Sequence, residues 1–405
     1  MNKHIKSIIY LIICTGTFSS SVNATDNNSE ARGIAMGNTG VASAYYLTAP
    51  FYNPALATNS DESDDFGVIY SMGLGFLDAD DTYSSIKSLT DYMDTDFGNT
   101  SSSTDEIIAD LETLKEYLDD IDGNKVFINI GLSVAVSIPT TPFSTTFFSR
   151  AYSEEILDIS IDSSAIDTLL NKTTPDQDDL IAASDAFSTM SLNLLNFTYG
   201  EVGFALAQDF LINEQHVSFG ITPKYQYFGT SAQENYIQNL SSSDFLQSPT
   251  NTDSAFNLDL GAVWYQDDFQ IGLAAKNVIS QSITAEYDSS TTTSDVIYDL
   301  KPLVTLGFAY TSEYFIAAVD ADLTEQTRFR GINDNTQMVN FGAEFNAWRW
   351  AQLRAGYQID LQRTLENTVT AGFGLSPFEL AHLDVAAYYA NSSQMGVATN
   401  FALTF

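Results

Sequence analysis

The chain has 405 residues, of which 52 are acidic and 16 are basic, so its formal net charge is −36 at pH 7. An acidic surface of this kind repels phosphate, which excludes nucleic-acid binding. The single cysteine, Cys14, excludes a disulfide or a cysteine-rich metal site within the chain.

The first predicted element is a secretory signal peptide at residues 1–24. Two lysines precede an apolar stretch at 8–18, and a small-residue run ends at Ala24. This order is typical of a signal peptide, and the apolar stretch is too short to span a membrane as a helix. Lipid attachment at Cys14 is disfavoured because Ile13 stands where a small residue is expected. We therefore expect cleavage after Ala24.

Residues 25–65 form the second predicted unit. Glycine and alanine dominate the stretch 31–44, which allows close backbone packing, and Asn53-Pro54 favours a tight turn. We expect a compact N-terminal segment that precedes the first strand.

The remainder, residues 66–405, repeats short segments in which apolar and polar side chains alternate. In 217–227 the apolar residues take the odd positions, and Ser218, Thr222 and Lys224 take even ones. Strands of ~9–11 alternating residues are the pattern of a membrane β-barrel. About fourteen such segments occur, at 66–76, 126–138, 143–152, 202–210, 217–227, 258–264, 271–275, 303–310, 315–323, 339–345, 353–359, 369–375, 383–389 and 394–405.

The links between these segments alternate in length. Short links lie at 139–142, 213–214, 267–268, 312–313, near Arg349 and at 377–381, and long ones at 77–124, 153–196, 230–254, 279–300, 324–335 and 362–367. Only the tight link near Asn391 breaks the alternation. Short turns on one side and long loops on the other predict an all-β fold, a transmembrane antiparallel β-barrel with its termini in the periplasm.

Two of the long loops carry helix-like sequence. The stretch 105–118 has apolar residues at helical spacing, and 163–195 reads as one or two helices around Pro175. These extracellular loops are acidic; a cap that binds cations or a partner is one interpretation, and a solvated acidic surface is the preferred one. The run from Asp78 is not a calcium-binding loop, because Tyr83 replaces the turn glycine. We expect no metal site and no cofactor.

Alternation also selects the charged residues that should face the lumen, because Lys or Arg facing lipid costs about 2–4 kcal/mol at the membrane midplane. Asp320 and Asp322 must share a face, where Lys224, Lys276 or Arg354 would offset their charge. The predicted lumen-facing residues are Glu201, Asp209, Lys224, Asp259, Lys276, Asp320, Asp322, Glu344, Arg354 and Asp384. A structural network is preferred over a substrate site for all of them.

Catalytic residues are not apparent. His216 and His382 both begin strands on the predicted periplasmic side, and no Gly-x-Ser-x-Gly motif occurs. The pair Asp320 and Asp322 has no supporting motif either. We expect that the protein is not an enzyme; a histidine paired with a serine and a carboxylate in a cavity near the outer leaflet would reverse that expectation.

The closing strand, 394–405, places Met395, Val397, Phe401, Leu403 and Phe405 on one face. It resembles the last strand of bacterial outer-membrane β-barrels, in which a terminal phenylalanine is part of the signal read by the assembly machinery. The resemblance implies that Phe401, Leu403 and Phe405 form an assembly signal. It also implies the outer membrane of a Gram-negative bacterium as the location, with lipid and the barrel assembly machinery as partners.

A family resemblance rests on the stretch from Ala31 to Ala57. It resembles the N-terminal region of FadL-type outer-membrane transporters, in which an Asn-Pro-Ala motif lies in a plug inside a fourteen-stranded barrel. More closely, it resembles a family of TraF-like conjugal transfer proteins. Patterns at 276–278 and 353–357 are also similar to FadL-type sequences. The resemblance implies a plug that contains Asn53, Pro54 and Ala55, with Gly33, Gly37 and Gly40 as its flexible part.

The resemblance implies passive transport of a hydrophobic or amphipathic small molecule. A non-transporting envelope component of a conjugal transfer or secretion apparatus is the alternative. A thioredoxin-like role is excluded, since no Cys-x-x-Cys occurs. The transporter predicts an apolar pocket against residues 31–57 and a gap in the barrel wall. The alternative predicts a lumen sealed by the plug and by side chains.

Overall fold

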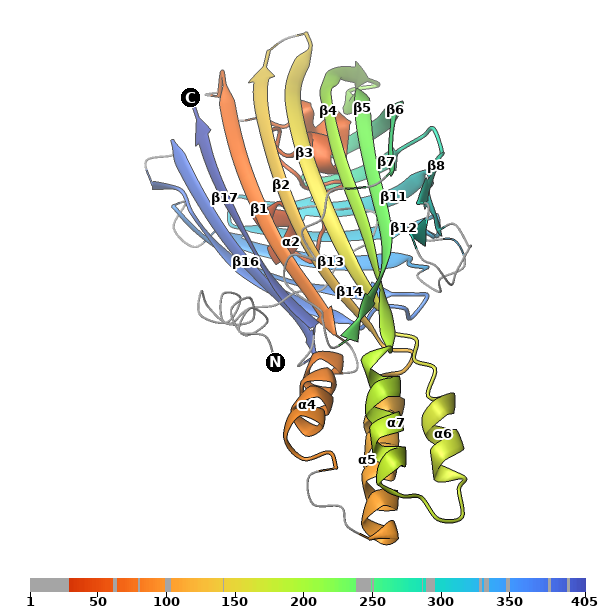
Figure 1. Cartoon of the computed structure of the whole chain (residues 1–405). Coiled ribbons are helices and arrows are strands. Elements are labelled where there is room, and N and C mark those ends of the chain that lie inside the picture. The colour runs from red at the N-terminus through yellow and green to blue at the C-terminus, as the bar shows by residue number, and fades with distance from the viewer. Residues whose placement is uncertain are drawn as a thin grey trace.

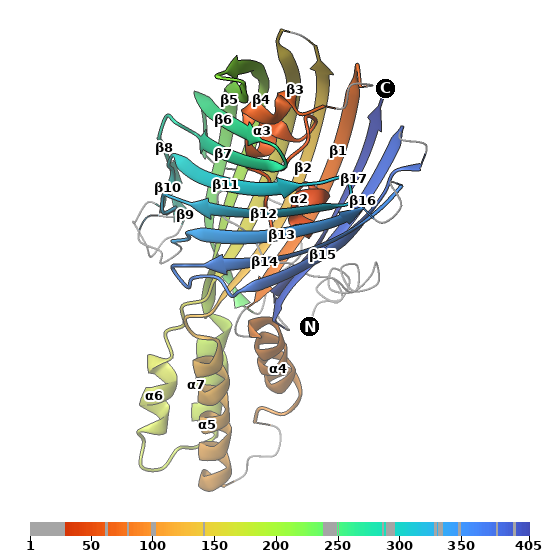
Figure 2. The ribbon, with the colours of Figure 1, turned by 180° about the vertical axis from the view of Figure 1, so that it is seen from behind.

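The structure is a computed structural model that describes residues 29–405 except 61–63, 79–80, 99–102, 141, 238–248, 250, 286, 289–295, 328–329, 331–334, 347–349, 378–379 and 392–393. The predicted signal peptide, residues 1–24 with Cys14, therefore lies outside the described residues. The chain forms a β-barrel with short helices inside it and longer helices at one end (Figures 1 and 2).

Fourteen of the fifteen strands of the main sheet form the barrel, and each pairs antiparallel with the next one along the chain. The ring closes where β17 pairs with β1. Every predicted segment overlaps one of these strands, so the predicted barrel of about fourteen strands is confirmed. Their bounds are β1 Gly67–Asp78, β2 Lys125–Pro139, β3 Ser144–Asp158, β4 Ser191–Ile212, β5 Gln215–Tyr236, β6 Asn251–Gln266, β7 Phe269–Lys276, β11 Leu303–Thr311, β12 Phe315–Asp322, β13 Met338–Asn346, β14 Ala351–Asp360, β15 Thr368–Leu375, β16 Ala381–Asn391 and β17 Gln394–Thr404.

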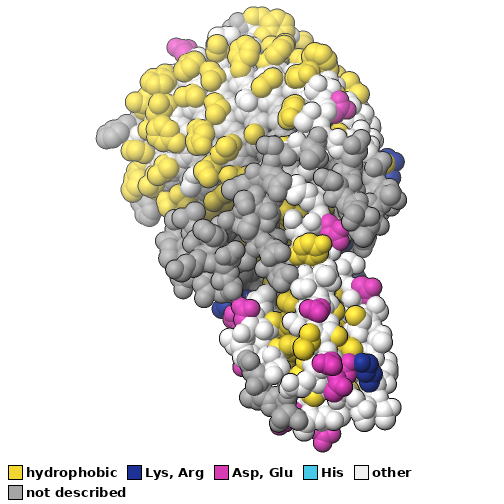
Figure 3. All heavy atoms as spheres, in the orientation of Figure 1, with side chains coloured by type: hydrophobic (Ala, Val, Ile, Leu, Met, Phe, Trp, Pro, Cys, Tyr) yellow, Lys and Arg dark blue, Asp and Glu magenta, His cyan; other side chains and the backbone are white. Residues whose placement is uncertain are grey.

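The barrel wall turns its apolar side chains outward. On β5, Phe219 and Ile221 are 48% and 40% exposed, whereas Ser218 and Thr222 on either side of them are buried. On β17 the outward Phe401 is likewise exposed, as the alternation predicts. Figure 3 shows hydrophobic side chains gathered on the part of the barrel surface that is coloured in this view, whereas the helical end has a mixed surface that includes acidic side chains. A wall that faces lipid needs this reversed arrangement, apolar outside and polar inside.

The short turns lie at the end of the barrel that carries the C-terminus, and the helices extend from the other end (Figure 1). Between β1 and β2 lie α4 Thr82–Thr95 and α5 Thr104–Ile121, and between β3 and β4 lie α6 Ser164–Leu170 and α7 Gln177–Ser188. None of the described helices is long and apolar enough to cross a membrane.

The helical end has a hydrophobic core of its own. Leu111, Leu114 and Leu118 of α5 are fully buried against residues of the other helices and of the strand ends. A capping box between Ser103 and Glu106 begins α5. The helix expected at 105–118 is therefore present.

One expectation for these loops was wrong, and one helix was missed. The helix predicted to run to Leu195 ends at Ser188, and 191–195 belong to β4. There Leu192 and Leu194 are buried against the helices on one face of the strand, and Leu195 and Phe197 are buried on the other, so the alternation changes face and is interrupted in the sequence. Helix α4 was not predicted.

The long link between β7 and β11 also contains structure that was not predicted. It forms a two-stranded antiparallel sheet of β8 Gln281–Ala285 and β10 Val296–Leu300. Between them β9, Tyr287–Asp288, pairs in parallel with β5 at Ala232 and Gln233.

Residues 29–60, here called the N-terminal segment, lie inside the barrel (Figures 1 and 2). They form α2 Ala31–Ala35, α3 Ala49–Tyr52 and the 3-10 helix η1 Pro54–Thr58. Nearly all of their side chains are buried, and they contact strands around the whole ring.

Candidate functional site in the barrel interior

The N-terminal segment packs against the wall through backbone contacts that only small residues allow. Gly37 has φ +66°, and a Cβ there would lie 2.6 Å from the carbonyl oxygen of Phe341. A Cβ on Gly33 or Gly40 would overlap the ring of Tyr52. The three predicted glycines are thus points of close packing, and their flexibility remains a prediction.

The Asn-Pro-Ala run forms the start of η1. The Asn53 side chain is fully buried; its Oδ1 accepts from the amide of Ala55 at 3.1 Å, and its Nδ2 donates to the carbonyl oxygens of Val41 at 2.9 Å and Ala262 at 3.2 Å. Asn53 therefore caps η1 and ties it to β6. Pro54 and Ala55 pack against Gly220 of β5, where a Cβ would lie 2.6 Å from the oxygen of Pro54.

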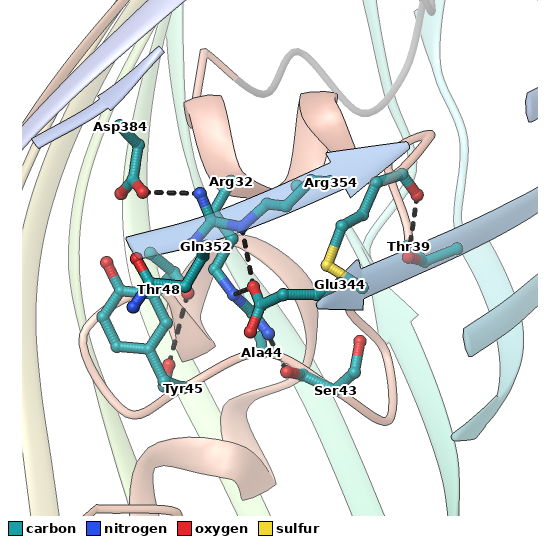
Figure 4. A network of polar contacts seen from close by, with 12 residues as sticks. Arg32, Thr39, Ser43, Ala44, Tyr45, Thr48, Glu344, Gln352, Arg354 and Asp384 are labelled. Carbon is teal, nitrogen blue, oxygen red and sulfur yellow. Dashed lines mark hydrogen bonds and ion pairs between the residues drawn. The ribbon is translucent and has the colours of Figure 1, made fainter. Parts of the chain in front are cut away.

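A first charged network joins this segment to the wall (Figure 4). Arg32 and Arg354 both donate to Oε2 of Glu344, at 2.9 and 2.7 Å, and Arg354 also pairs with Asp384 at 2.6 Å. Each of these four side chains is at most 9% exposed. Glu30 caps α2 by accepting from the amides of Arg32 and Gly33.

A second charged network lies on β3 to β6. Lys224 is between Glu201 and Asp259, at 3.1 and 2.9 Å, and Arg150 donates to Glu201 at 2.5 Å. All four side chains are buried. Opposite charges alternate through this group, so each buried charge is paired.

The other predicted lumen charges bind backbone groups. Lys276 donates to the carbonyl oxygen of Phe51, and Asp320 accepts from the amides of Gly40 and Val41 at 2.7 and 2.9 Å. Asp322, half-buried, accepts from Thr305 and from the amide of Met338. These donors are N–H and O–H groups, and the expectation that a cation offsets the charge of the two aspartates stays a prediction.

An aromatic group, here called the mouth cluster, lies toward the helical end beyond the second network. It consists of Tyr152, Ile156, Leu195, Phe197, Tyr199, Phe228, Ala232, Ile283, Tyr298 and Leu300, all buried. The rings of Phe197 and Tyr298 stack with centroids 3.6 Å apart. The mouth cluster contains no residue of the N-terminal segment, whose apolar residues form a separate cluster with wall residues such as Ile69, Phe148 and Val263. The apolar pocket that the transporter hypothesis places against residues 31–57 stays a prediction.

The barrel wall is paired throughout most of its described length. Between β4 and β5 the register is interrupted after Gly203↔Lys224 and resumes at Leu206↔Ile221. Pro223 lies in this interruption and has no N–H to donate. A second irregularity, near Tyr389, is at the end of β16.

Neither histidine forms a catalytic arrangement. Asp209, at the rim, accepts from both His216 at 2.5 Å and Ser218 at 3.0 Å, so the serine is on the carboxylate and not on the imidazole. Both ring nitrogens of His382 contact hydroxyls, those of Ser376 and Thr404. Among the described residues, no group of three or more His, Cys, Asp and Glu is placed to hold a metal ion.

Sequence reasoning missed several interior residues. Arg150 shares the inward face of β3 with Thr146 and Phe148, so alternation within 143–152 identifies it. Arg32 and Glu30 lie in the N-terminal segment, where no periodicity indicates a partner. Phe197 lies beyond the predicted bounds of its strand, and Tyr298 lies in a predicted loop.

Comparisons with known proteins agree with this architecture. A family model described as "F plasmid transfer operon, TraF, protein" matches residues 50–322. No curated protein matches the chain.

Several solved structures are similar in fold. A TodX deltaS2S3 mutant monoaromatic hydrocarbon channel has a TM-score of 0.55 at 12% identity, over 93% of this chain and 98% of that one. The toluene transporter TbuX of Ralstonia pickettii has a TM-score of 0.52 at 13% identity, over 93% and 98%. A FadL homologue from Pseudomonas aeruginosa has a TM-score of 0.53 at 10% identity, over 96% and 99%. These likenesses establish the fold and confirm the FadL-type architecture.

Proposed function

Because the chain belongs to the family described as "F plasmid transfer operon, TraF, protein", and because its barrel has the FadL-type fold, we propose that it is an outer-membrane channel. Its cargo would be hydrophobic or amphipathic small molecules that pass without an energy source. The membership agrees with the resemblance seen in residues 31–57.

The outer surface supports a membrane location. Large apolar side chains on every part of the wall are 37–75% exposed, for example Phe256 at 75% and Val202 at 52%. Exposing this much apolar surface to water is unfavourable by about 25 cal/mol per Å². In lipid the same surface carries no such cost, and the polar inner faces remain enclosed.

The interior supports a neutral cargo. The buried cations Arg32, Arg354, Lys224 and Arg150 each have a carboxylate partner. Paired charges of this kind offer little attraction to a charged solute. The observation that carries the proposal is the mouth cluster, a buried aromatic group enclosed by the barrel between the second network and the helical end.

A second candidate is a sealed barrel that acts as an envelope component of a transfer apparatus. It is favoured by the N-terminal segment, which is bound to β12, β13, β15 and β17 by buried hydrogen bonds and an ion pair. A segment fixed in this way closes the lumen unless it moves.

Uptake experiments separate the two candidates. Cells that carry or lack the protein would be given labelled oleate and labelled toluene in parallel, and folded barrel would be quantified by its heat-modifiable mobility on gels. Protein-dependent uptake of either compound supports the channel. A folded barrel without uptake of either compound overturns the channel proposal and favours the envelope component.

A matched variant tests whether passage goes through the interior. Asn53→Ala removes the bond to Ala262 that ties η1 to β6 and the bond to Val41 within the N-terminal segment. We expect altered uptake with folded barrel retained. The control is Asn171→Ala, at the exposed C-terminal end of α6. This change leaves the barrel interior untouched and should not alter uptake.

The assembly role of Phe401, Leu403 and Phe405 is part of the proposal. The backbone of Phe405 pairs with Phe66, and the two rings lie 6.3 Å apart. We expect Phe405→Asp to reduce the folded barrel in the outer membrane several-fold. Normal amounts of heat-modifiable protein would contradict this role.

A further inference from the structure

The side chain of Tyr52 connects two distant strands through the interior of the barrel. It belongs to α3 and is 1% exposed. Its hydroxyl donates to Oε2 of Glu30 at 3.3 Å, and Glu30 in turn accepts from the side chain of Asn400 on β17. The ammonium group of Lys276, the last residue of β7, lies 5.8 Å from the centroid of the Tyr52 ring. The ring is thus linked to β17 through Glu30 and to β7 through Lys276.

These two strands lie opposite each other in the barrel. Between them, β1 to β6 form the wall on one side and β11 to β16 form it on the other. The contacts that run from β7 through Tyr52 and Glu30 to β17 therefore cross the width of the lumen. The ring of Tyr52 lies within that cross-section.

Two glycines of the N-terminal segment enclose the ring. A Cβ on Gly33 would overlap the hydroxyl of Tyr52, and a Cβ on Gly40 would overlap its ring. The backbone of both glycines is fixed, because the amide of Gly33 donates to Glu30 and that of Gly40 donates to Asp320, each at 2.7 Å. Neither glycine has a side chain that could fill the space if the ring were removed. With charged groups beside it, that space would take up water.

The neighbouring Phe51 has a different environment. It is also 1% exposed, but its ring meets that of Phe148 on β3 edge to face, with centroids 5.9 Å apart. Both rings belong to an apolar cluster that includes wall residues. Loss of the Phe51 ring would therefore leave an apolar space beside the wall, and such a space stays dry.

We propose that the Tyr52 ring is the seal that keeps ions and small hydrophilic solutes from passing through the lumen. The ring excludes them by occupying the cross-section, and Glu30 and Lys276 hold it there. The inference goes beyond the proposed function, because a channel for hydrophobic cargo and a sealed envelope component both require this barrier. Tyr52 then determines which solutes the barrel excludes.

Conductance of the purified full chain in planar lipid bilayers tests this, with potassium chloride as the probe. Wild type should show no discrete conductance steps. Tyr52→Ala should show them, because water and ions enter the space that the ring leaves. Tyr52→Phe keeps the ring and should stay closed. Swelling of proteoliposomes in arabinose should rise several-fold in Tyr52→Ala and stay at the wild-type rate in Tyr52→Phe.

The matched control is Phe51→Ala, which removes a ring of similar size from the same helix and should show no steps. Heat-modifiable mobility on gels confirms the folded barrel in each variant. Tyr52→Leu replaces Tyr52→Ala if the alanine variant does not fold, since leucine is too short to fill the space of the ring. Steps of equal size in Phe51→Ala, steps in Tyr52→Phe, or a folded Tyr52 variant without a ring that stays closed would overturn the inference.

A second measurement restores the ring by chemistry. The chain's only cysteine, Cys14, is replaced by serine, and Tyr52→Cys then supplies a single thiol. Tyr52→Cys should show conductance steps, and labelling with benzyl methanethiosulfonate should abolish them because a ring again fills the site. Steps that persist after complete labelling, checked by mass spectrometry, would show that the ring is not the seal.

The uptake experiment distinguishes this inference from the proposed function. Uptake of oleate or toluene by wild-type cells, together with a folded but silent Tyr52→Ala, retains the channel and removes the seal. Conductance steps in Tyr52→Ala without uptake of either compound by wild-type cells retain the seal and remove the channel.

Discussion

The barrel interior has two regions that are closed in different ways. Around the N-terminal segment, buried ion pairs such as Arg32–Glu344 join the chain's first described residues to distant strands. At the mouth cluster the buried residues are mostly apolar, and Arg330, whose side chain is 57% exposed, pairs with the buried Asp299 of β10. Breaking a buried pair leaves an unpaired charge, whereas removing Arg330 leaves Asp299 with the hydrogen bond from Ser282. The first region is thus fixed by buried charges, and the second is held mainly by apolar contacts.

The largest expected effect comes from breaking the fixed region at its centre. Glu344→Ala leaves Arg32 and Arg354 facing each other in a buried site without their shared carboxylate. We expect the free energy of unfolding to fall by about 3–5 kcal/mol. Urea unfolding in micelles, followed by tryptophan fluorescence, measures it. Glu116→Ala, at an exposed position of α5, is the control, and an equal loss in both variants would refute the contrast.

A smaller effect should come from overpacking the contact between the segment and the wall. A side chain at Gly220 would collide with the backbone of Pro54 and Ala55, so Gly220→Val should cost about 1–3 kcal/mol. At Gly200 a Cβ would have its nearest neighbour at 3.9 Å, the oxygen of Arg150. Gly200→Ala should therefore be tolerated in the same unfolding assay. Similar losses at both glycines would mean that the segment does not pack closely.

The mouth region should respond weakly in stability. Arg330→Gln removes the ion pair with Asp299, and we expect a loss of at most about 1 kcal/mol. Hydrogen exchange should nevertheless become faster at the amides of β10, while the exchange rates of the β13 amides should stay unchanged. Equal acceleration in both strands would indicate general destabilisation and would contradict the separation of the two regions.

The smallest effect should depend on pH. Burial raises the pKa of Asp299, but hydrogen bonds from Ser282 and Arg330 and the charge of Arg330 outweigh it, so the pKa lies below its ordinary value. A carboxylate whose pKa is lowered by folding stabilises the folded state at pH values above its pKa in the unfolded chain. This stabilisation is lost as the pH falls through its pKa in the folded state. Exchange at β10 should thus accelerate below about pH 4. Asp299→Asn should remove this pH dependence of exchange. If the pH dependence persists in the variant, Asp299 is not its origin.

The wall of the barrel was predictable because one rule governs it. Each wall position faces either lipid or the interior, so alternation gives the strands, their number and the inward direction of Glu201, Lys224 and Glu344. The rule stops where the surroundings change. Along β4, Leu192 and Leu194 are buried against the helices on one face, whereas Leu195 and Phe197 are buried in the mouth cluster on the other, so the apolar face changes between 194 and 195.

The partners of the inward residues were not predictable in the same way. Arg32 and Glu344 are 312 residues apart, and no local pattern relates them. Their contact follows from ring closure and from the path of the N-terminal segment inside it. Tyr298 is harder still, because its strand pairs with another strand of the same loop and not, among the described strands, with the wall.

Contact between the N-terminal segment and β17 has a consequence for the order of folding. Ala31 donates to Asn400 across 369 residues, and Gly40 to Asp320 across 280. These contacts cannot form until almost the whole chain has been synthesised, and contacts of such separation form slowly. The segment is therefore made before every strand, yet it acquires its anchors only when the last strands arrive. The first described segment to be synthesised is thus among the last to be anchored by hydrogen bonds to the wall.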